Sequence, residues 1–450
     1  MGVRILMMAL ALWSGQAFAN DPGLQELLKR STFASGQGDV FSIRYRSRLQ
    51  ALTGNPALFH YDAVTLSIAA SLYSRSAPAV LWESAPLQKS NLGGDHYFNS
   101  ALPAYFRKGH SDRLYVILPG VFSTSEDGSF VNSVVGTLDR VHGKGDLPNV
   151  LYIPGIYTTE FMGRNITRFP WNQQAMARDI YQRIRSHYPK FFREGKMGVI
   201  GSSGGATLAI HLLAEDTKQG GMKLGALSLS PLIDTLEVLQ RLDDQYARLE
   251  ERGDHKNTLT GIDYSNLITK AFRFLRTYEG SPTYEDVLLQ ASGEKFNPAS
   301  LQEMRDRFVS EIYQEDLGKM RTLTIRDRKQ LRTTSLRFLT HIVSLGCLKN
   351  PKNSFQECRD RTSVKGDLGK VTAPLFIFLA QDDPVAAADP EKTGQQPPGV
   401  ASTLAQASLQ PHITVFNPLY GGHAGIYFDE VFDELVEKFF HVHEDVTPVN

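Results

Sequence analysis

The stretch "GVIGSSGGATLAIHLL", from Gly198 to Leu213, decides how this chain is interpreted. Short apolar residues lead into a cluster of glycines and serines, and an apolar run with the character of a helix follows. Gly201-Ser202-Ser203-Gly204-Gly205 fits the pattern G-x-S-x-G. In that pattern the central serine sits in a sharp turn between a strand and a helix, and the glycines leave room for neighbouring main chain. The stretch therefore predicts Ser203 as a nucleophile at the carboxyl end of a strand.

Other interpretations of the same glycines are weaker. A phosphate-binding P-loop requires a lysine after the glycines, and none follows here. A dinucleotide-binding loop requires the spacing G-x-G-x-x-G and a strand-end acid about 20 residues later, and neither is present. Ser202 as the nucleophile would place Ile200 at the first glycine position, which favours Ser203. A purely structural glycine turn stays open on this segment alone.

A serine nucleophile needs a base, and the base needs an acid to orient it. The segment "LAQDDPVAA" places Asp382 and Asp383 at the end of an apolar strand pattern, and "YGGHAG" places His423 between glycines after the next one. Taken singly, Asp-Asp-Pro is also good turn chemistry, and a lone histidine is usually structural. The chain order Ser203, Asp383, His423 favours the catalytic interpretation, because a known serine-hydrolase arrangement follows this order.

Strand patterns and helix patterns alternate around these segments. One helix pattern, "QAMARDIYQRIRSHY", places Met176, Ile180 and Ile184 on one face. Such alternation predicts a mostly parallel sheet flanked by helices. The predicted strands are "APAVLWES", "RLYVILPG", "NVLYIPGI", "KMGVIG", "LGALSLSPLID", "APLFIFLAQDDP" and "HITVFNPLYGGHAG", and "GIYFDEVFDELVEKFFHVH" is the predicted closing helix.

The alternation stops at residues 235–369, which are rich in charge and helical in pattern. Leu301, Met304, Phe308 and Ile312 share one helix face, and "RKQLRTTSLRFLTHIVSL" repeats the pattern. Such apolar faces pack against a core in most proteins. A helical lid over a pocket is compatible with the same pattern.

These motifs together resemble the α/β-hydrolase superfamily, over roughly residues 112–442 without the helical insertion. The segments "GSSGGA", "AQDDPV" and "GGHAG" resemble its nucleophile elbow, acid turn and histidine turn. "LGALSLSPLID" suggests a branch of carboxylesterase- and phospholipase-like proteins. The resemblance implies an α/β fold with a mostly parallel central sheet, flanking helices and a helical lid. It also favours Asp383 over Asp382 as the acid.

The resemblance further implies an oxyanion hole made by two main-chain N–H groups, those of Gly204 and Val121. The sequence departs from the family at Pro119, where a histidine often stands, so any role of that side chain is lost. Some relatives carry the acid one strand earlier, which makes Asp234 an alternative to Asp383.

The amino terminus has the three parts of a secretory signal peptide: Arg4, an apolar run over residues 5–13, and Ala17-Phe18-Ala19. A membrane anchor is the alternative, but the run is shorter than the roughly 20 residues of a span. We therefore expect an exported protein, periplasmic or secreted. The expected division is 1–19 signal peptide, 20–110 extension and first strands, 111–234 first part of the core, 235–369 insertion, 370–443 second part of the core and 444–450 tail.

Composition limits the remaining options. Lys and Arg total 48 and balance 48 Asp and Glu, so no basic excess indicates nucleic-acid binding. In an exported protein Cys347 and Cys358 are expected to form a disulfide, and two free buried thiols are the alternative. Two cysteines do not supply a zinc site, and we expect His441 and His443 on the surface of the closing helix rather than on a metal.

The sequence thus predicts an exported serine hydrolase that cleaves carboxylic esters, with lipid esters as one option. Ser203, Asp383 and His423 would be the catalytic residues, and no cofactor would be required. The expected partner is a small-molecule or lipid ester. Two alternatives stay open: an acyltransferase with the same three residues, and a non-catalytic binding protein that keeps the fold.

Overall fold

The structure is a computed structural model of the 450-residue chain. It describes residues 22–31, 81–91, 96–98, 100–120, 129–155, 172–217, 219–238, 347, 354–381, 383, 385–386, 396–418, 421–423, 425–428 and 431–442. The strands are β1 (Glu83–Ser84), β2 (Tyr105–Arg107), β3 (Leu114–Leu118), β4 (Asn149–Tyr152), β5 (Met197–Ser202), β6 (Gly225–Leu229), β7 (Leu375–Phe378) and β8 (Ile413–Phe416). The helices are α2 (Pro22–Arg30), α5 (Ser129–His142), α7 (Gln173–His187), α8 (Pro189–Glu194), α9 (Gly204–Asp216), α16 (Phe355–Thr362), α17 (Lys365–Leu368), α18 (Pro398–Ala407), the 3₁₀ helix η3 (Gly425–Phe428) and α19 (Phe432–Phe439).

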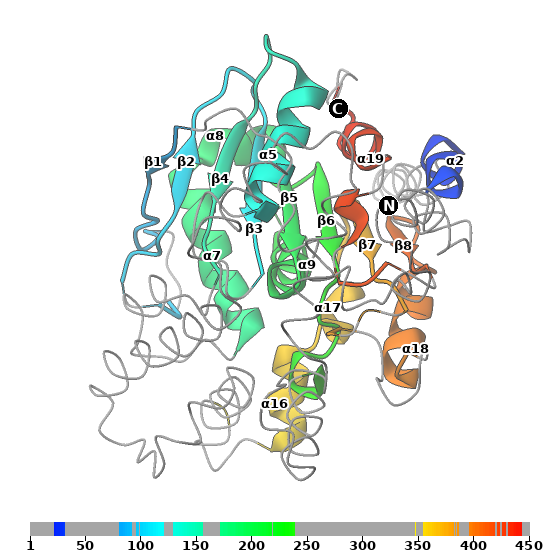
Figure 1. Ribbon diagram of the computed structural model, residues 1–450. Helices are drawn as coiled ribbons and strands as arrows, with labels where there is room; N and C mark the ends of the chain where they lie inside the picture. The colour runs from blue at the N-terminus through cyan, green and yellow to red at the C-terminus, as the bar shows by residue number, and fades with distance from the viewer. Residues whose placement is uncertain are drawn as a thin grey trace, which may run out of the picture.

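The described strands form one eight-stranded sheet in the order β1-β2-β4-β3-β5-β6-β7-β8 (Figure 1). β2 runs antiparallel to both of its neighbours, and every pair from β4 to β8 is parallel. Parallel strands bring their carboxyl ends to the same edge of the sheet. The loops after β5, β7 and β8 therefore leave from one edge of the sheet. The predicted residues Ser203, Asp383 and His423 lie in these three loops.

The central strands are buried on both faces, which explains why they appear as continuous apolar runs in the sequence. In β3, Leu114, Val116 and Leu118 face one half of the core, while Tyr115 and Ile117 face the other. The six predicted strands from "RLYVILPG" onward are confirmed as β3 to β8. In "APAVLWES" only Glu83–Ser84 is strand among the described residues, because this edge pairs with a three-residue β2.

Helices cover both faces of the sheet (Figure 1). One half of the core receives side chains of α7, α8, α9, α17 and α18, and the other receives those of α2, α5 and α19. The predicted helix face of Met176, Ile180 and Ile184 is fully buried, as expected. The closing helix is confirmed as η3 and α19.

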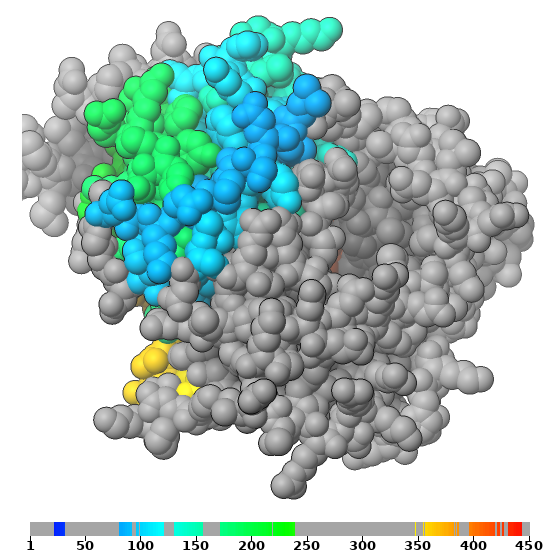
Figure 2. Space-filling view, turned by 90° about the vertical axis from the view of Figure 1, so that its left-hand side faces the viewer, coloured from blue at the N-terminus to red at the C-terminus, as the bar shows by residue number. Residues whose placement is uncertain are grey.

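A buried ion pair on α7 holds the chain that leads to β2. Arg183 and Asp179 are both inaccessible, and the guanidinium bonds the carboxylate at 2.8 Å. Arg183 also donates to the main-chain oxygens of Leu87, Phe98 and Ser100 at 2.6–2.9 Å. Every buried donor of this pair thus has an acceptor, which buried charges require. In Figure 2 the described residues of this stretch, 81–91, 96–98 and 100–107 (blue to cyan), spread over this side of the molecule, beside α7 and α8 (green).

The two ends of residues 235–369 meet beside the end of β6. Val364 N donates to Ile233 O at 3.0 Å, and Asp234 forms a bridge with Ser363. Arg359 of α16 bonds the Asp234 carboxylate at 2.5 Å. The helical stripe at Leu301–Ile312 and the segment "RKQLRTTSLRFLTHIVSL" lie outside the described residues.

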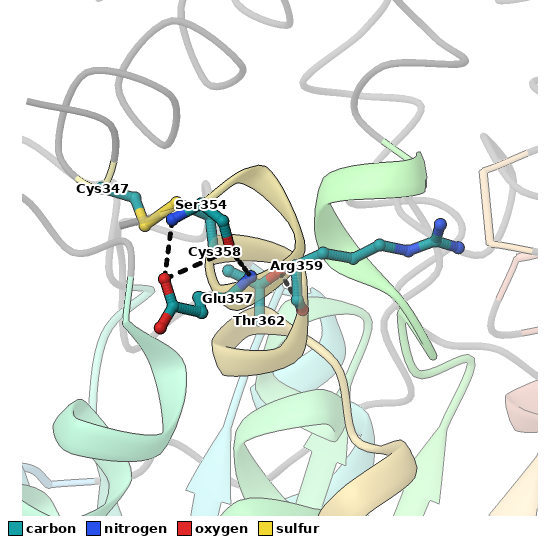
Figure 3. Close-up of a disulfide and its surroundings, with 6 residues drawn as sticks. All are labelled: Cys347, Ser354, Glu357, Cys358, Arg359 and Thr362. Carbon is teal, nitrogen blue, oxygen red and sulfur yellow. Dashed lines mark hydrogen bonds between the residues drawn. A yellow bond between two sulfur atoms is a disulfide. The ribbon is translucent and has the colours of Figure 1, made fainter. Parts of the chain in front are cut away.

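The predicted disulfide between Cys347 and Cys358 is confirmed (Figure 3). Both cysteines are buried, with exposures of 0% and 1%, and their Cα atoms are 5.7 Å apart. Cys358 lies on α16, whose first turn is closed by a capping box between Ser354 and Glu357. The disulfide therefore fixes residue 347 to a helix that is itself bonded to Asp234.

Removal of this disulfide is expected to destabilise the fold. Replacing both Cys347 and Cys358 by Ala opens a loop with a sequence separation of 11. By loop-closure entropy we expect the free energy of unfolding to fall by about 2–3 kcal/mol. Urea unfolding measures the change. Reductant should lower the midpoint of the wild type and leave the double variant unaffected, and a wild-type midpoint that ignores full reduction would contradict the prediction.

Candidate active site

Ser203 sits in the sharp turn that the motif predicts. It directly follows β5, precedes α9 and has φ 54° and ψ −124°, a conformation that a non-glycine residue adopts only under constraint. Its N–H donates to Leu229 O of β6 at 2.9 Å, which holds the strained residue against the neighbouring strand. The side chain is partly exposed, while Ser202 is buried at the end of β5. The turn thus raises the Ser203 side chain from the sheet edge.

The first and last glycines of the motif are required by contacts with main chain. A Cβ on Gly205 would lie 2.1 Å from Leu118 O and 2.3 Å from Pro119 O. A Cβ on Gly201 would lie 2.4 Å from Gly205 O. These contacts are to main-chain atoms, so they cannot be relieved by the rotation of a neighbouring side chain. A side chain at either position would therefore force the neighbouring main chain to shift.

Gly205→Ala is therefore expected to destabilise the fold strongly. The added methyl group must displace the end of β3, and overpacking of this kind costs about 3 kcal/mol. Chemical denaturation of the purified variant measures the loss. Gly366→Ala is the matched control, because a Cβ at Gly366 meets nothing within 4 Å. Equal stability of the two variants would contradict the close contact at Gly205.

The carboxylate of Asp383 lies beyond the end of β7 and is fully buried. Its Oδ1 accepts hydrogen bonds from Val385 N at 2.9 Å and Ala386 N at 2.8 Å. These two main-chain donors fix the position and orientation of the carboxylate. The same carboxylate contacts the His423 ring, with Nδ1 at 2.9 Å from Oδ2 and 3.1 Å from Oδ1.

This contact assigns the tautomer of His423. An ionised carboxylate only accepts hydrogen bonds, so the proton of the imidazole belongs on Nδ1. Nε2 then carries the lone pair that a general base uses. The loop after β8 that carries His423, which we call the histidine loop, lies against the end of β7. A Cβ on Gly421 of this loop would lie 2.9 Å from both Ala380 Cβ and Phe378 Cζ. The histidine loop is thereby held against β7, the neighbour of β8 on the side of β5.

The space beside Ser203 is lined by the loop after β3 and by the start of α9. A Cβ on Gly120 would lie 3.6 Å from Ser203 Cβ, so this loop passes next to the predicted nucleophile. A small pocket here has mostly apolar walls, among them Leu118, Ile153 and Leu208, and it reaches Gly204. The N-terminus of α9 adds a positive field at this point. Val121, the second predicted oxyanion donor, lies outside the described residues.

Two side chains of α9 connect the elbow helix to its surroundings. Thr207 Oγ1 accepts from Leu232 N at 2.8 Å, which ties the helix to the loop after β6. One turn later, His211 Nδ1 lies 2.6 Å from the Asp367 carboxylate of α17. Burial raises the pKa of Asp367, but the hydrogen bond and charge of His211, with Lys370, outweigh it and hold the pKa below its usual value. The ionised Asp367 carboxylate therefore contributes stability at neutral pH, and this contribution is lost as the pH falls through its lowered pKa.

Asp234, the alternative acid, is engaged elsewhere. Its carboxylate bonds Arg359 at 2.5 Å and accepts from Glu237 N at 3.1 Å, which makes it a helix cap. Asp382 lies outside the described residues, as does His443. His441 is described and accepts from Arg113 through its main-chain oxygen. Among the described residues, no group of three or more His, Cys, Asp or Glu side chains has a metal-binding arrangement.

The strand order, the position of the single antiparallel strand among β2 to β8 and the strained turn after β5 decide the fold class. The fold is that of the α/β-hydrolases. The predicted mostly parallel sheet with flanking helices is thus confirmed by the described part of the chain, while most of the predicted helical lid lies outside the described residues. In this fold a catalytic serine, acid and histidine follow one another along the chain, and the predicted site residues Ser203, Asp383 and His423 stand in that order.

No model of a protein family matches the sequence, and no curated protein matches it either. Solved structures that resemble the fold include an esterase of Pyrococcus furiosus, with 13% identity, a TM-score of 0.42, and coverage of 81% of this chain and 92% of that one. An acetylester hydrolase of Corynebacterium glutamicum has 11% identity, a TM-score of 0.39 and coverage of 80% and 96%. A carboxyl esterase of Bacillus coagulans has 14% identity, a TM-score of 0.38 and coverage of 81% and 98%.

Proposed function

We propose that the protein is a serine hydrolase that cleaves carboxylic esters, with Ser203 as nucleophile, His423 as base and Asp383 as orienting acid. One observation carries the proposal. A buried carboxylate, Asp383, binds Nδ1 of His423 at the same sheet edge at which a strained turn presents Ser203. A histidine oriented in this way can take the proton of a weak hydroxyl nucleophile, and we propose that His423 does so for Ser203.

The proposed reaction has two halves. Ser203 Oγ attacks the ester carbonyl while Nε2 of His423 takes its proton, and the Gly204 N–H stabilises the oxyanion. The imidazolium then gives the proton to the leaving alcohol, which leaves an acyl group on Ser203. Water attacks the acyl-enzyme with His423 again as base, and the carboxylic acid departs. Asp383 stabilises the imidazolium throughout.

We also propose that the protein is exported. The predicted cleavage point after Ala19 precedes α2, whose first residue is Pro22. Leu24, Leu27 and Leu28 of α2 are buried in the core, so removal of residues 1–19 would spare the described fold. The disulfide supports an oxidising compartment. In the part of the chain that the structure describes, no helix has the length and hydrophobicity to cross a bilayer.

A panel of p-nitrophenyl esters from short to long acyl chains tests the activity. We expect hydrolysis by the wild type, and the chain-length optimum separates a short-chain esterase from an enzyme of lipid esters. An added alcohol serves as the second arm of the assay. Acyl transfer to the alcohol in place of water would show an acyltransferase, and binding of the ester without turnover would show a binding protein.

A further inference from the structure

The loops that carry Asp383 and His423 are joined before they reach these two residues. The paired parts of β7 and β8 end at Phe378 and Phe416. One more main-chain bond follows, from Leu379 N to Phe416 O at 3.1 Å. Beyond this point a parallel pair no longer supplies regular bonds, so anything that keeps the loops together has to come from side chains or irregular contacts.

Two side-chain amides continue the connection, one from each loop. Asn417 Nδ2 donates to the main-chain oxygen of Leu379. In return, Gln381 Nε2 donates to the main-chain oxygen of Asn417 at 3.3 Å, and Gln381 N donates to Pro418 O at 2.8 Å. We call the Gln381 and Asn417 side chains the amide latch. Each bonds the main chain of the opposite loop.

The latch lies close to the catalytic pair along the chain. Gln381 precedes Asp383 by two residues, and Asn417 precedes His423 by six. Leu379 is fully buried, so loss of the Asn417 donor leaves a buried carbonyl without this partner, which is unfavourable. Gly421, which follows Asn417 in the histidine loop, packs closely against Ala380 of the acid loop, the loop after β7 that carries Asp383. The Asp383–His423 contact is thus the last of a series of contacts between the same two loops.

We propose that Asn417 and Gln381 are positioning residues of the reaction, which hold the histidine loop against the acid loop so that His423 meets Asp383 in the correct orientation. The inference rests on the proposed function. The latch acts through Asp383 and His423 and not through the substrate. A displacement of about 1 Å at a reacting group lowers the rate about 100-fold. Loss of the latch should therefore lower kcat and leave KM little changed.

Asn417→Asp tests the proposal, because it keeps the shape of the side chain and removes the donor. The chain offers a matched control in Asn149→Asp. Asn149 Nδ2 also donates to main-chain oxygens, of Ser111 at 2.7 Å and Arg113 at 3.1 Å, but at the amino end of β4. That end is the sheet edge opposite to Ser203. Both variants should lose stability, and only one should lose catalysis.

We expect kcat to fall about 10- to 100-fold in Asn417→Asp, with KM within about twofold, and to stay within about threefold in Asn149→Asp. Gln381→Leu removes the other side-chain donor of the latch, Gln381 Nε2, and is the test variant if Asn417→Asp fails to fold. The double variant should lose less than the product of the two single losses, because each breaks the same latch. Equal kcat in Asn417→Asp, Asn149→Asp and the wild type, or fully multiplicative losses in the double variant, would overturn the proposal.

An NMR measurement separates failure of this inference from failure of the proposed function. The proton on His423 Nδ1 that binds Asp383 should give a far-downfield resonance in the wild type, whether or not esters are cleaved. The latch predicts that this resonance weakens or disappears in Asn417→Asp and persists in Asn149→Asp. An inert wild type with this pattern would refute the hydrolase and keep the latch. An active wild type whose resonance survives in Asn417→Asp would refute the latch.

Discussion

Ser203→Ala is expected to lower kcat for ester hydrolysis about 10⁵- to 10⁶-fold, to the level set by binding and oxyanion stabilisation alone. The physical reason is that the acyl-enzyme route disappears when the hydroxyl is removed. Stability should be nearly unchanged, because the Ser203 main chain, and not its side chain, makes the bond to Leu229 O. Steady-state kinetics on the best p-nitrophenyl ester, with circular dichroism as a check of folding, measures the effect.

Ser202→Ala is the matched control for this prediction. Ser202 is the adjacent residue, it carries the same hydroxyl, and it is buried at the end of β5. We expect its kcat to stay within about tenfold of the wild type, since the hydroxyl is not at the tip of the turn. If Ser202→Ala were inactive and Ser203→Ala active, the nucleophile would be wrongly assigned.

Asp383→Asn is expected to lower kcat about 10⁴-fold with little loss of stability. The amide oxygen of Asn can still accept from Val385 N and Ala386 N, so its NH₂ group must face His423 Nδ1. Nδ1 then becomes an acceptor, and the proton moves to Nε2. The histidine is held in the tautomer that cannot take a proton from Ser203. Measurement of kcat over about pH 6–9 for the variant and the wild type tests this prediction.

Asp234→Asn separates the two acids that the sequence left open. Asp234 is also a buried strand-end carboxylate that accepts from a main-chain N–H, so the chemical change is the same. Its other partners are Arg359 at 2.5 Å and Lys365 at 4.0 Å, and not the histidine. We expect activity within about tenfold of the wild type and a lower stability, because an ion pair and part of a cap are lost. A larger loss of kcat than in Asp383→Asn would assign the acid to Asp234.

The parallel core was predictable from the sequence because its strands are buried on both faces. A run such as "RLYVILPG" has no polar residue inside β3, and only a buried strand or helix explains it. The turn at Ser203 was predictable because Gly201 and Gly205 are imposed by main-chain contacts. Features set by local geometry leave a pattern at a fixed spacing, and the sequence shows such patterns directly.

Other features depend on residues that are distant in the chain. The Arg183–Asp179 pair lies within a helix whose apolar stripe gives no sign of it, since its partners are main-chain oxygens about 90 residues earlier. β1 and β2 have two and three residues, too few for a period-2 pattern. Gln381 and Asn417 appear in the sequence only as polar residues just after apolar runs. That position after a strand was the one signal in the sequence that could have drawn attention to them, and it does not show which main-chain oxygen each amide bonds.

A serine-directed fluorophosphonate probe, followed by intact mass and peptide mapping, tests the central claim most directly. We expect one adduct per chain on Ser203, no adduct in Ser203→Ala, and slow labelling in His423→Ala, because the probe reacts only with an activated hydroxyl. An unlabelled wild type, or a wild type labelled at Ser202 or at another serine, would contradict the assignment of Ser203 as a nucleophile activated by His423 and Asp383.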